Sequence, residues 1–188
     1  MSYNGGAEQG GQSANRVGDR GARSGAMTDQ TSDSFTIRLA TLHDLPAIRG
    51  VLLSVRSEFD VVDDTDASDT DLDDLERNYF GRGGVFEVVE DCRSSQIVGC
   101  AGLLPLTERR AELCKMYILR SARGRGLGKR LLEDLLEAAR RSGFAEVWLE
   151  TNSVLTVATG LYMKFGFQPV EPGHLLPRCD QAYLLRLP

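Results

Sequence analysis

A basic, glycine-rich loop has the residue types and the spacing of a ligand-binding segment. It reads Arg123-Gly124-Arg125-Gly126-Leu127-Gly128, and an amphipathic stretch over 127–142 follows it. Glycines let the backbone approach a ligand closely and adopt conformations closed to other residues. At the start of a helix, free backbone N–H groups and the helix dipole both favour an anion. Residues 120–130 include no acidic side chain, so the pattern predicts an anion site suited to a pyrophosphate.

Two familiar phosphate-binding patterns do not fit this loop. A P-loop continues from Gly-Lys to Ser or Thr, whereas Gly128-Lys129 is followed by Arg130. The dinucleotide fingerprint G-x-G-x-x-G, begun at Gly124, would require glycine where Lys129 stands. Taken alone, the loop leaves open a solvated basic turn or a contact to RNA.

The elements that must position this loop can be read from hydrophobic periodicity. We expect strands at 35–39, 85–90, 96–104, 111–118, 145–150 and 181–187. We expect helices from a cap at Thr41 or Asp44 to about 57, and at 71–80, 127–142 and 156–165. An antiparallel run of strands comes first, and a strand–helix–strand unit follows. This order predicts an α/β (α+β) fold with a mixed, mainly antiparallel central sheet flanked by helices.

Length and composition limit the classes of protein to be considered. The 188 residues suit one domain, and residues 1–34, rich in Gly, Ser, Gln and Asn, are predicted to be a disordered N-terminal tail before a domain at 35–188. A formal charge of -5 argues against wholesale nucleic-acid binding. No apolar run approaches the roughly 20 residues of a membrane span, and no signal-peptide pattern opens the chain.

The cysteines and histidines indicate neither a disulfide framework nor a metal site. Four cysteines form no C-x-x-C pair, and there are only two histidines. Free thiols are typical of a reducing compartment, so a cytoplasmic protein without a bound metal is expected.

Several ordered motifs give the chain its resemblance to a known family. Arg123-x-x-Gly126-x-Gly128 matches an Arg/Gln-x-x-Gly-x-Gly/Ala signature, and the strand at 111–118 precedes it. Trp148-Leu149-Glu150-Thr151 follows, and 158–167 reads A-x-x-L-Y-x-x-x-G-F. Over residues 35–187 the sequence resembles the GCN5-related N-acetyltransferase (GNAT) family.

The resemblance implies acetyl-coenzyme A as the cofactor and splayed parallel strands at 111–118 and 145–151. Backbone groups of Met116, Tyr117 and Ile118 would hold the pantetheine arm, and one N–H there could stabilise the oxyanion that forms during acyl transfer. The pyrophosphate would lie against the loop that runs from Arg123 to Lys129. One departure from the family pattern is Leu155, which stands where many relatives carry a cofactor-contacting asparagine.

The resemblance also implies roles for three side chains. Tyr162 matches the tyrosine that returns a proton to the coenzyme A sulfur, although its type and spacing also suit a packed aromatic residue. Glu112 matches a carboxylate that serves as general base, directly or through water, and Glu150 is the second candidate. Either glutamate could instead pair with a neighbouring arginine, and water alone could relay the proton.

The acceptor is the least determined part of the prediction. Residues 58–76 hold ten acidic side chains and no basic one. They could attract a cationic amine or form a solvated loop. The leading hypothesis is direct transfer of acetyl to a primary amine of a small molecule or amino acid, by a protein that could be a homodimer. The alternatives are acetylation of a protein or peptide amine, and a non-catalytic acyl-CoA sensor.

Overall fold

A seven-stranded sheet organises the chain. The computed structural model describes residues 34–61 and 69–188. The strands are β1 (Phe35–Leu39), β2 (Val85–Asp91), β3 (Gln96–Pro105), β4 (Arg110–Ile118), β5 (Glu146–Thr151), β6 (Gln168–Val170) and β7 (Gln181–Arg186). Their order is β1-β2-β3-β4-β5-β7-β6, and every neighbouring pair is antiparallel except β4 and β5. The predicted mixed, mainly antiparallel sheet is confirmed.

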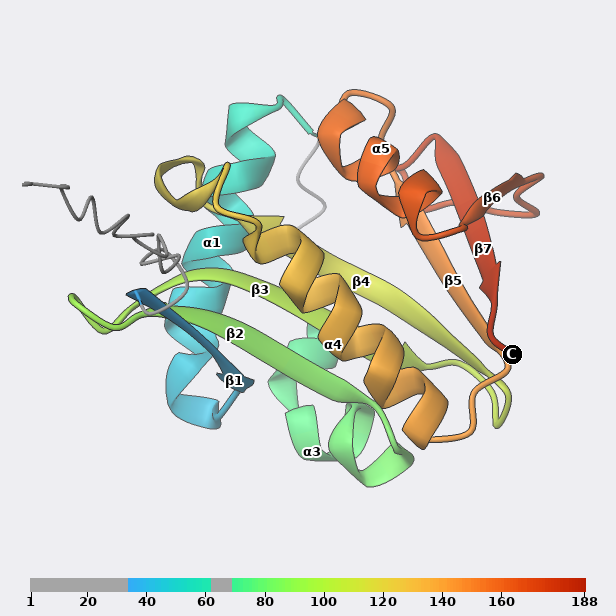
Figure 1. Ribbon diagram of the computed structural model, residues 1–188, viewed down its shortest axis with the longest axis horizontal. Helices are drawn as coiled ribbons and strands as arrows, with labels where there is room; N and C mark the ends of the chain where they lie inside the picture. The colour runs from blue at the N-terminus through green and yellow to red at the C-terminus, as the bar shows by residue number, and fades with distance from the viewer. Residues whose placement is uncertain (1–33, 62–68) are drawn as a thin grey trace, which may run out of the picture.

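Helices flank the sheet (Figure 1). They are α1 (Leu45–Glu58), α3 (Leu75–Asn78), α4 (Leu127–Arg141) and α5 (Thr156–Lys164). Helices α1 and α3 share a hydrophobic cluster with one face of β2 and β3, whereas α4 and α5 belong to the cluster on the opposite face. Short 3-10 turns complete the set: η2 (Leu42–Asp44), η3 (Thr70–Asp73), η4 (Phe80–Arg82) and η5 (Arg120–Ala122).

Helix α4 forms as its sequence pattern predicts. Its leucines at 127, 131, 132, 135 and 136 are all buried against the sheet, while charged side chains occupy the other face. Burying one leucine side chain contributes about 1.5–3 kcal/mol, so this stripe fixes the helix on the sheet. Gly143, with a φ of 79°, takes the left-handed conformation just beyond the helix.

The helix expected at 71–80 is wrong. The segment instead forms η3, α3 and η4 in succession. Asp74 breaks the run because its backbone is extended and its carboxylate accepts the Arg77 N–H at 2.9 Å, as an N-cap does. A local hydrogen bond therefore restarts the helix where acidic residues alone suggested continuity. The short strand β6 is also not among the strands expected from the sequence.

The parallel strands β4 and β5 part soon after they meet. Their register pairs only Arg110 with Glu146, Ala111 with Val147 and Glu112 with Trp148. Beyond Glu112, β4 runs on to Ile118 without β5 beside it, and β5 stays paired with β7. The predicted splayed strands are therefore present, and they open toward the start of α4.

Two predictions meet the limits of the described residues. The tail expected at 1–34 lies outside them except for Ser34, and residues 62–68 of the acidic stretch also lie outside. Within 34–61 and 69–188, no helix combines the length and apolar character needed to cross a membrane.

Candidate active site

A large cavity lies where β4 and β5 have parted. Its volume is about 740 Å³. One wall is formed by β4 at Met116, Tyr117 and Ile118, another by the loop and first turn of α4, and a third by α5. Its size and its three walls can hold an extended ligand laid along β4.

The loop before α4 lines this larger cavity through Gly124, Gly126 and Gly128. Gly124 and Gly126 have φ values of 77° and 74°, a left-handed conformation that other residues adopt only with strain. Gly126 is the N-cap, and its carbonyl accepts the first helical hydrogen bond from Arg130. Among the described residues, no acceptor bonds the amides of residues 124–129. The loop is therefore chemically suited to a phosphate, because converging amides and the helix dipole favour an anion.

The basic side chains of the loop do not all turn toward the cavity. Arg123 reaches Glu58 with two hydrogen bonds of 2.7 and 2.9 Å, and its Nε donates to the Ile118 carbonyl at 2.8 Å. Arg125 lies over the ring of Phe35, with 5.2 Å from its Cζ to the ring centroid. Arg123 thus fastens the loop to the end of α1 and to β4. Arg123 and Lys129 both line the cavity, whereas Arg125 does not. The guanidinium of Arg123 is bonded to Glu58, and Lys129 has only an exposed ion pair of 3.4 Å with Glu133. The backbone and Lys129 are therefore the groups best placed for a phosphate.

A bulge in β4 decides which side chains face this cavity. The register with β3 shifts between Cys100 and Gly102, and Lys115 has a φ of 53°. Leu113 and Met116 consequently lie on the same face, in the cluster with α4, although they are three residues apart. Without the bulge, strict alternation would turn Met116 to the other face.

A smaller cavity adjoins the larger one. It measures about 50 Å³ and contains both candidate bases, Glu112 and Glu150. Five residues line both cavities: Met116, Tyr117, Leu155, Ala158 and Tyr162. The larger cavity therefore meets the smaller one at a shared wall, as a donor site must meet an acceptor site.

Tyr162 lies in this shared wall. Its side chain is buried, and its hydroxyl donates to the Met116 sulfur at 3.8 Å. Burial raises the pKa of the phenol, and Tyr117 adds to the shift, so the hydroxyl keeps its proton at neutral pH. Thioether sulfur is a weak acceptor, and the hydroxyl can exchange it for a stronger one.

Glu112 has the electrostatics of a general base. Burial raises its pKa to about 7, with a further contribution from the neighbouring negative charge of Glu150. A carboxyl that titrates near neutral pH can both accept and release a proton there. Glu150 is partly committed elsewhere, because its Oε2 accepts the backbone N–H of Leu176 at 3.0 Å.

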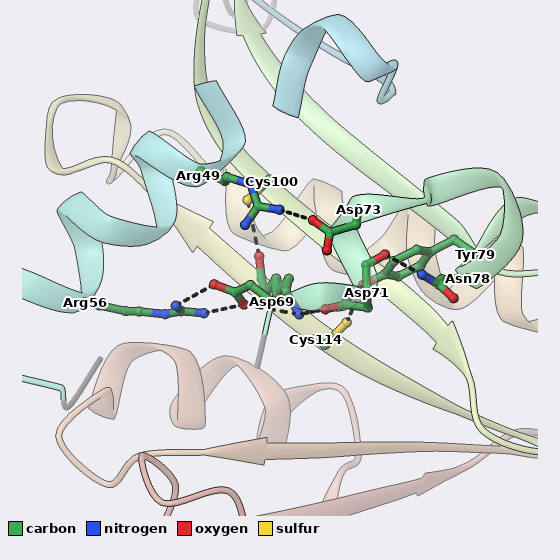
Figure 2. A network of polar contacts seen from close by, with 10 residues as sticks. Arg49, Arg56, Asp69, Asp71, Asp73, Asn78, Tyr79, Cys100 and Cys114 are labelled. Carbon is green, nitrogen blue, oxygen red and sulfur yellow. Dashed lines mark hydrogen bonds and ion pairs between the residues drawn. The ribbon is translucent and has the colours of Figure 1, made fainter. Parts of the chain in front are cut away.

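Part of the acidic stretch is buried and ion-paired rather than solvated (Figure 2). Asp69 accepts two hydrogen bonds from Arg56, at 2.7 and 2.9 Å, and the two side chains are only 6% and 2% exposed. Lys115 contacts Asp71 at 2.7 Å and Asp69 at 3.5 Å, and Asp71 also accepts a hydrogen bond from Tyr79. We call these five residues the ion cluster. It joins α1 and η3 to the bulge of β4.

Sequence reasoning missed two residues of the smaller cavity, Lys115 and Arg178. Lys115 carried no signal, because only the bulge turns it toward the ion cluster. Arg178 lies in the loop between β6 and β7, outside every motif singled out from the sequence. Leu155 lines both cavities, whereas Asn152 lines the smaller one and bonds the Arg178 carbonyl at 2.9 Å.

Comparisons with known proteins agree with this geometry. An N-acetyltransferase of Escherichia coli K12, YjgM, is 35% identical over 150 residues, which cover 77% of this chain and 89% of that protein. Mammalian relatives match about half of the chain, and the aligned part is less than half of their length.

Solved structures show the same fold. A GNAT-family acetyltransferase from Staphylococcus aureus Mu50 superposes with a TM-score of 0.76 at 24% identity, over 82% of this chain and 99% of that one. YncA from Salmonella typhimurium, described as a putative acetyltransferase and solved with acetyl-CoA, has a TM-score of 0.64 at 20% identity, over 82% and 95%.

The family itself is settled by sequence. The profile of the Acetyltransferase (GNAT) family matches residues 52–167, more than half of the chain. The match includes the glycine loop, the splayed strands and Tyr162, so it covers all of the described lining of the larger cavity and most of that of the smaller one. This chain belongs to the GNAT family of acetyltransferases, enzymes that take their acyl group from acetyl-CoA.

Proposed function

We propose that the protein transfers acetyl from acetyl-CoA to a primary amine of a small molecule or amino acid, by direct attack of the amine on the thioester. The observation that carries the proposal is the shared wall between the two cavities, which contains Tyr162. A donor in the larger cavity and an acceptor in the smaller one would meet there, and no covalent enzyme intermediate is required.

Acetyl-CoA supplies an activated acetyl group as a thioester, and the protein supplies the groups that bind the cofactor. The amides of residues 124–129 and Lys129 suit the pyrophosphate, and Met116, Tyr117 and Ile118 of β4 suit the pantetheine arm. The splay supports this arrangement, because it leaves β4 unpaired by β5 beyond Glu112. Backbone groups of an unpaired strand can bond an extended ligand as they would bond a neighbouring strand.

Two side chains manage the protons. The acceptor arrives as an ammonium group, and Glu112 takes a proton from it so that the nitrogen lone pair can form the new C–N bond. As the C–S bond breaks, its electron pair leaves with the sulfur, and Tyr162 donates its phenolic proton there. The nitrogen then loses its second proton to solvent. Glu112 releases its proton and the Tyr162 phenolate takes one up, so that both side chains return to their starting states and one proton is released per turnover. The pKa of Glu112, raised to about 7, supports its role as base. The raised pKa of Tyr162 keeps the phenol protonated until the C–S bond breaks, and it also makes the phenol a weaker acid.

The size of the smaller cavity favours a small acceptor over a protein amine. The loop between β6 and β7 contributes Leu176, Arg178 and Cys179 to its lining, and this cover restricts access.

We also propose a cytoplasmic location, and the homodimer stays a prediction that light scattering can test.

The function can be tested by thiol release from acetyl-CoA with a panel of primary amines. We expect turnover by the wild type and a fall of about 100-fold in Tyr162→Phe, because general acid catalysis contributes 10²–10⁴-fold. The acetyl-CoA dissociation constant, measured by calorimetry, should stay within about twofold. Tyr183→Phe is the matched control, since Tyr183 is buried and its hydroxyl bonds Gln181 away from both cavities.

Two results would contradict the proposal. Unchanged turnover in Tyr162→Phe would remove Tyr162 from the acid role. Binding of acetyl-CoA by the wild type with no turnover on any amine would favour a non-catalytic acyl-CoA sensor.

A further inference from the structure

Arg178 lines the smaller cavity, and its guanidinium has an unsatisfied donor. Its Nη1 is buried and has no hydrogen-bond partner among the described residues. A buried donor without an acceptor is costly, and a charged one more so. Native structures rarely keep such a group unless a ligand, water or ion completes it. A carboxylate is the acceptor whose geometry and charge suit a guanidinium best.

The loop that carries Arg178 is fastened to the end of β5. The Arg178 carbonyl accepts from Asn152 at 2.9 Å, and the Asp180 N–H donates to the Thr151 carbonyl at 3.1 Å. Glu150 holds the same loop through the Leu176 N–H at 3.0 Å. The backbone of Arg178 is therefore positioned before any ligand arrives, which lowers the entropy lost on binding.

The cavity combines this cation with two carboxylates. Glu112 and Glu150 line it together with Arg178, and the charge of Arg178 acts on Glu112. Lys115 also lines it, but its ammonium contacts Asp71 and Asp69 in the ion cluster. A polyamine or an aminoglycoside would bring several positive charges toward Arg178 and Lys115, and such like-charge contacts are unfavourable. A ligand with one positive and one negative group matches both sides.

We propose that the acceptor is a zwitterionic amino acid, whose carboxylate binds Arg178 while its amine lies beside Glu112 and Glu150. The inference rests on the proposed function and names its substrate class. Arg178 is then a specificity-determining residue that separates amino acids from amines lacking a carboxylate.

The test compares L-amino acids with their own carboxamides. Each pair differs only in the group proposed to bind Arg178, and spermidine and short peptides complete the panel. We expect the wild type to favour an amino acid over its carboxamide by about tenfold or more in kcat/KM, since a hydrogen bond to a charged group contributes about 1.5–3 kcal/mol. The reaction is followed by thiol release from acetyl-CoA.

Variants of Arg178 sharpen this comparison. Arg178→Gln should bring the ratio close to one, mainly through the KM of the amino acid, and leave the KM of acetyl-CoA unchanged. Arg178→Lys should restore part of the preference, which a purely structural role would not. Arg93→Gln is the control, because Arg93 is exposed on the β2–β3 hairpin and lines neither cavity. If Arg178→Gln fails to fold, the wild-type ratio still decides.

Several outcomes overturn the inference. They are equal activity on an amino acid and its carboxamide, better activity on spermidine or on peptides, and equal losses on both members of a pair in Arg178→Gln. If no amine is acetylated, the proposed function fails instead, and calorimetry with amino acids and carboxamides decides the inference. Tighter binding of the amino acid then supports it, and equal or absent binding overturns it.

Discussion

Two groups of charged side chains lie next to each other along β4. The charges of one group are paired within the protein, and those of the other are not fully paired. In the ion cluster, the Asp69 carboxylate and the Arg56 guanidinium are paired by two hydrogen bonds inside the protein. In the smaller cavity, Glu112 is held at a pKa of about 7 by burial and by Glu150, and Arg178 keeps a donor without a partner. Only two residues separate Glu112 from Lys115, which belongs to the cluster.

This difference indicates which charged groups stabilise the fold and which are available to bind a substrate. Burial is the largest single influence on Asp69 and would raise its pKa, yet the hydrogen bonds from Arg56, together with the positive charges of Arg56, Lys115 and Arg178, lower the pKa. At Glu112 the positive charges of Lys115 and Arg178 also act to lower the pKa, but burial and the charge of Glu150 outweigh them. Removing one member of a buried ion pair destabilises the fold, because its partner is left uncompensated. A buried charged group without a full set of partners lowers stability and is available to bind a ligand. Substitutions in the ion cluster and in the smaller cavity should therefore have different effects.

The largest effect is expected in the ion cluster. Asp69→Ala removes the carboxylate that Arg56 and Lys115 both contact, so the free energy of unfolding should fall by about 3–5 kcal/mol. Urea titration followed by circular dichroism measures it. Asp73→Ala is the control in the same segment, because its pair with Arg49 is exposed and exposed pairs contribute about 0–1 kcal/mol. Equal losses in the two variants would contradict the prediction that the ion cluster contributes more to stability than an exposed ion pair does.

The next effect is on turnover. Glu112→Gln should lower kcat/KM by about 100-fold at neutral pH, because it removes a general base. The wild-type profile of kcat/KM should rise with pH through a midpoint near 7, since the base must be ionised. The variant should lose this rise. Initial rates over pH 5–9 are the measurement.

Glu150→Gln separates the two candidate bases. It removes the negative charge that helps to raise the pKa of Glu112, so the midpoint should move to lower pH while most of the turnover survives. A larger loss of turnover in Glu150→Gln than in Glu112→Gln would transfer the role of base to Glu150.

The smallest effect is one of stability, and its sign is opposite to that in the ion cluster. The pKa of Glu112 is about 7 when folded, against 4.5 for an ordinary glutamate, so the folded state binds the proton more tightly. The free energy of unfolding of the wild type should therefore fall as pH rises from about 4.5 to about 7. At pH 8 Glu112→Gln should be more stable than the wild type by roughly 1–3 kcal/mol.

Urea titrations at pH 8 and pH 5 check this sign, because the gain should shrink at the lower pH. Glu146→Gln is the companion control. Glu146 pairs with Arg110, which lowers its pKa, so this variant should show no gain. A destabilised Glu112→Gln protein would place Glu112 with the structural charges instead.

Some predictions from sequence succeeded because their causes are local. The leucines of α4 repeat at helical spacing within one segment, and Gly124 and Gly126 precede it where left-handed conformations are needed. Other expectations failed because their causes are not local. Nothing in the acidic stretch itself shows that Asp69 will meet Arg56 or that Asp71 will meet Lys115, and so a helix at 71–80 seemed consistent with its composition.

The family, the mixed sheet, the glycine loop and the helix behind it could all be predicted from residue types, because each depends on short and regular spacings along the chain. Only the tertiary structure decided which charges are paired. The bulge at Lys115 shifts the alternation of β4, and a loop fastened to β5 brings Arg178 to Glu112 and Glu150. The physical reason is that electrostatics in a protein depends on burial and on distances through space, which segments far apart in the chain set together.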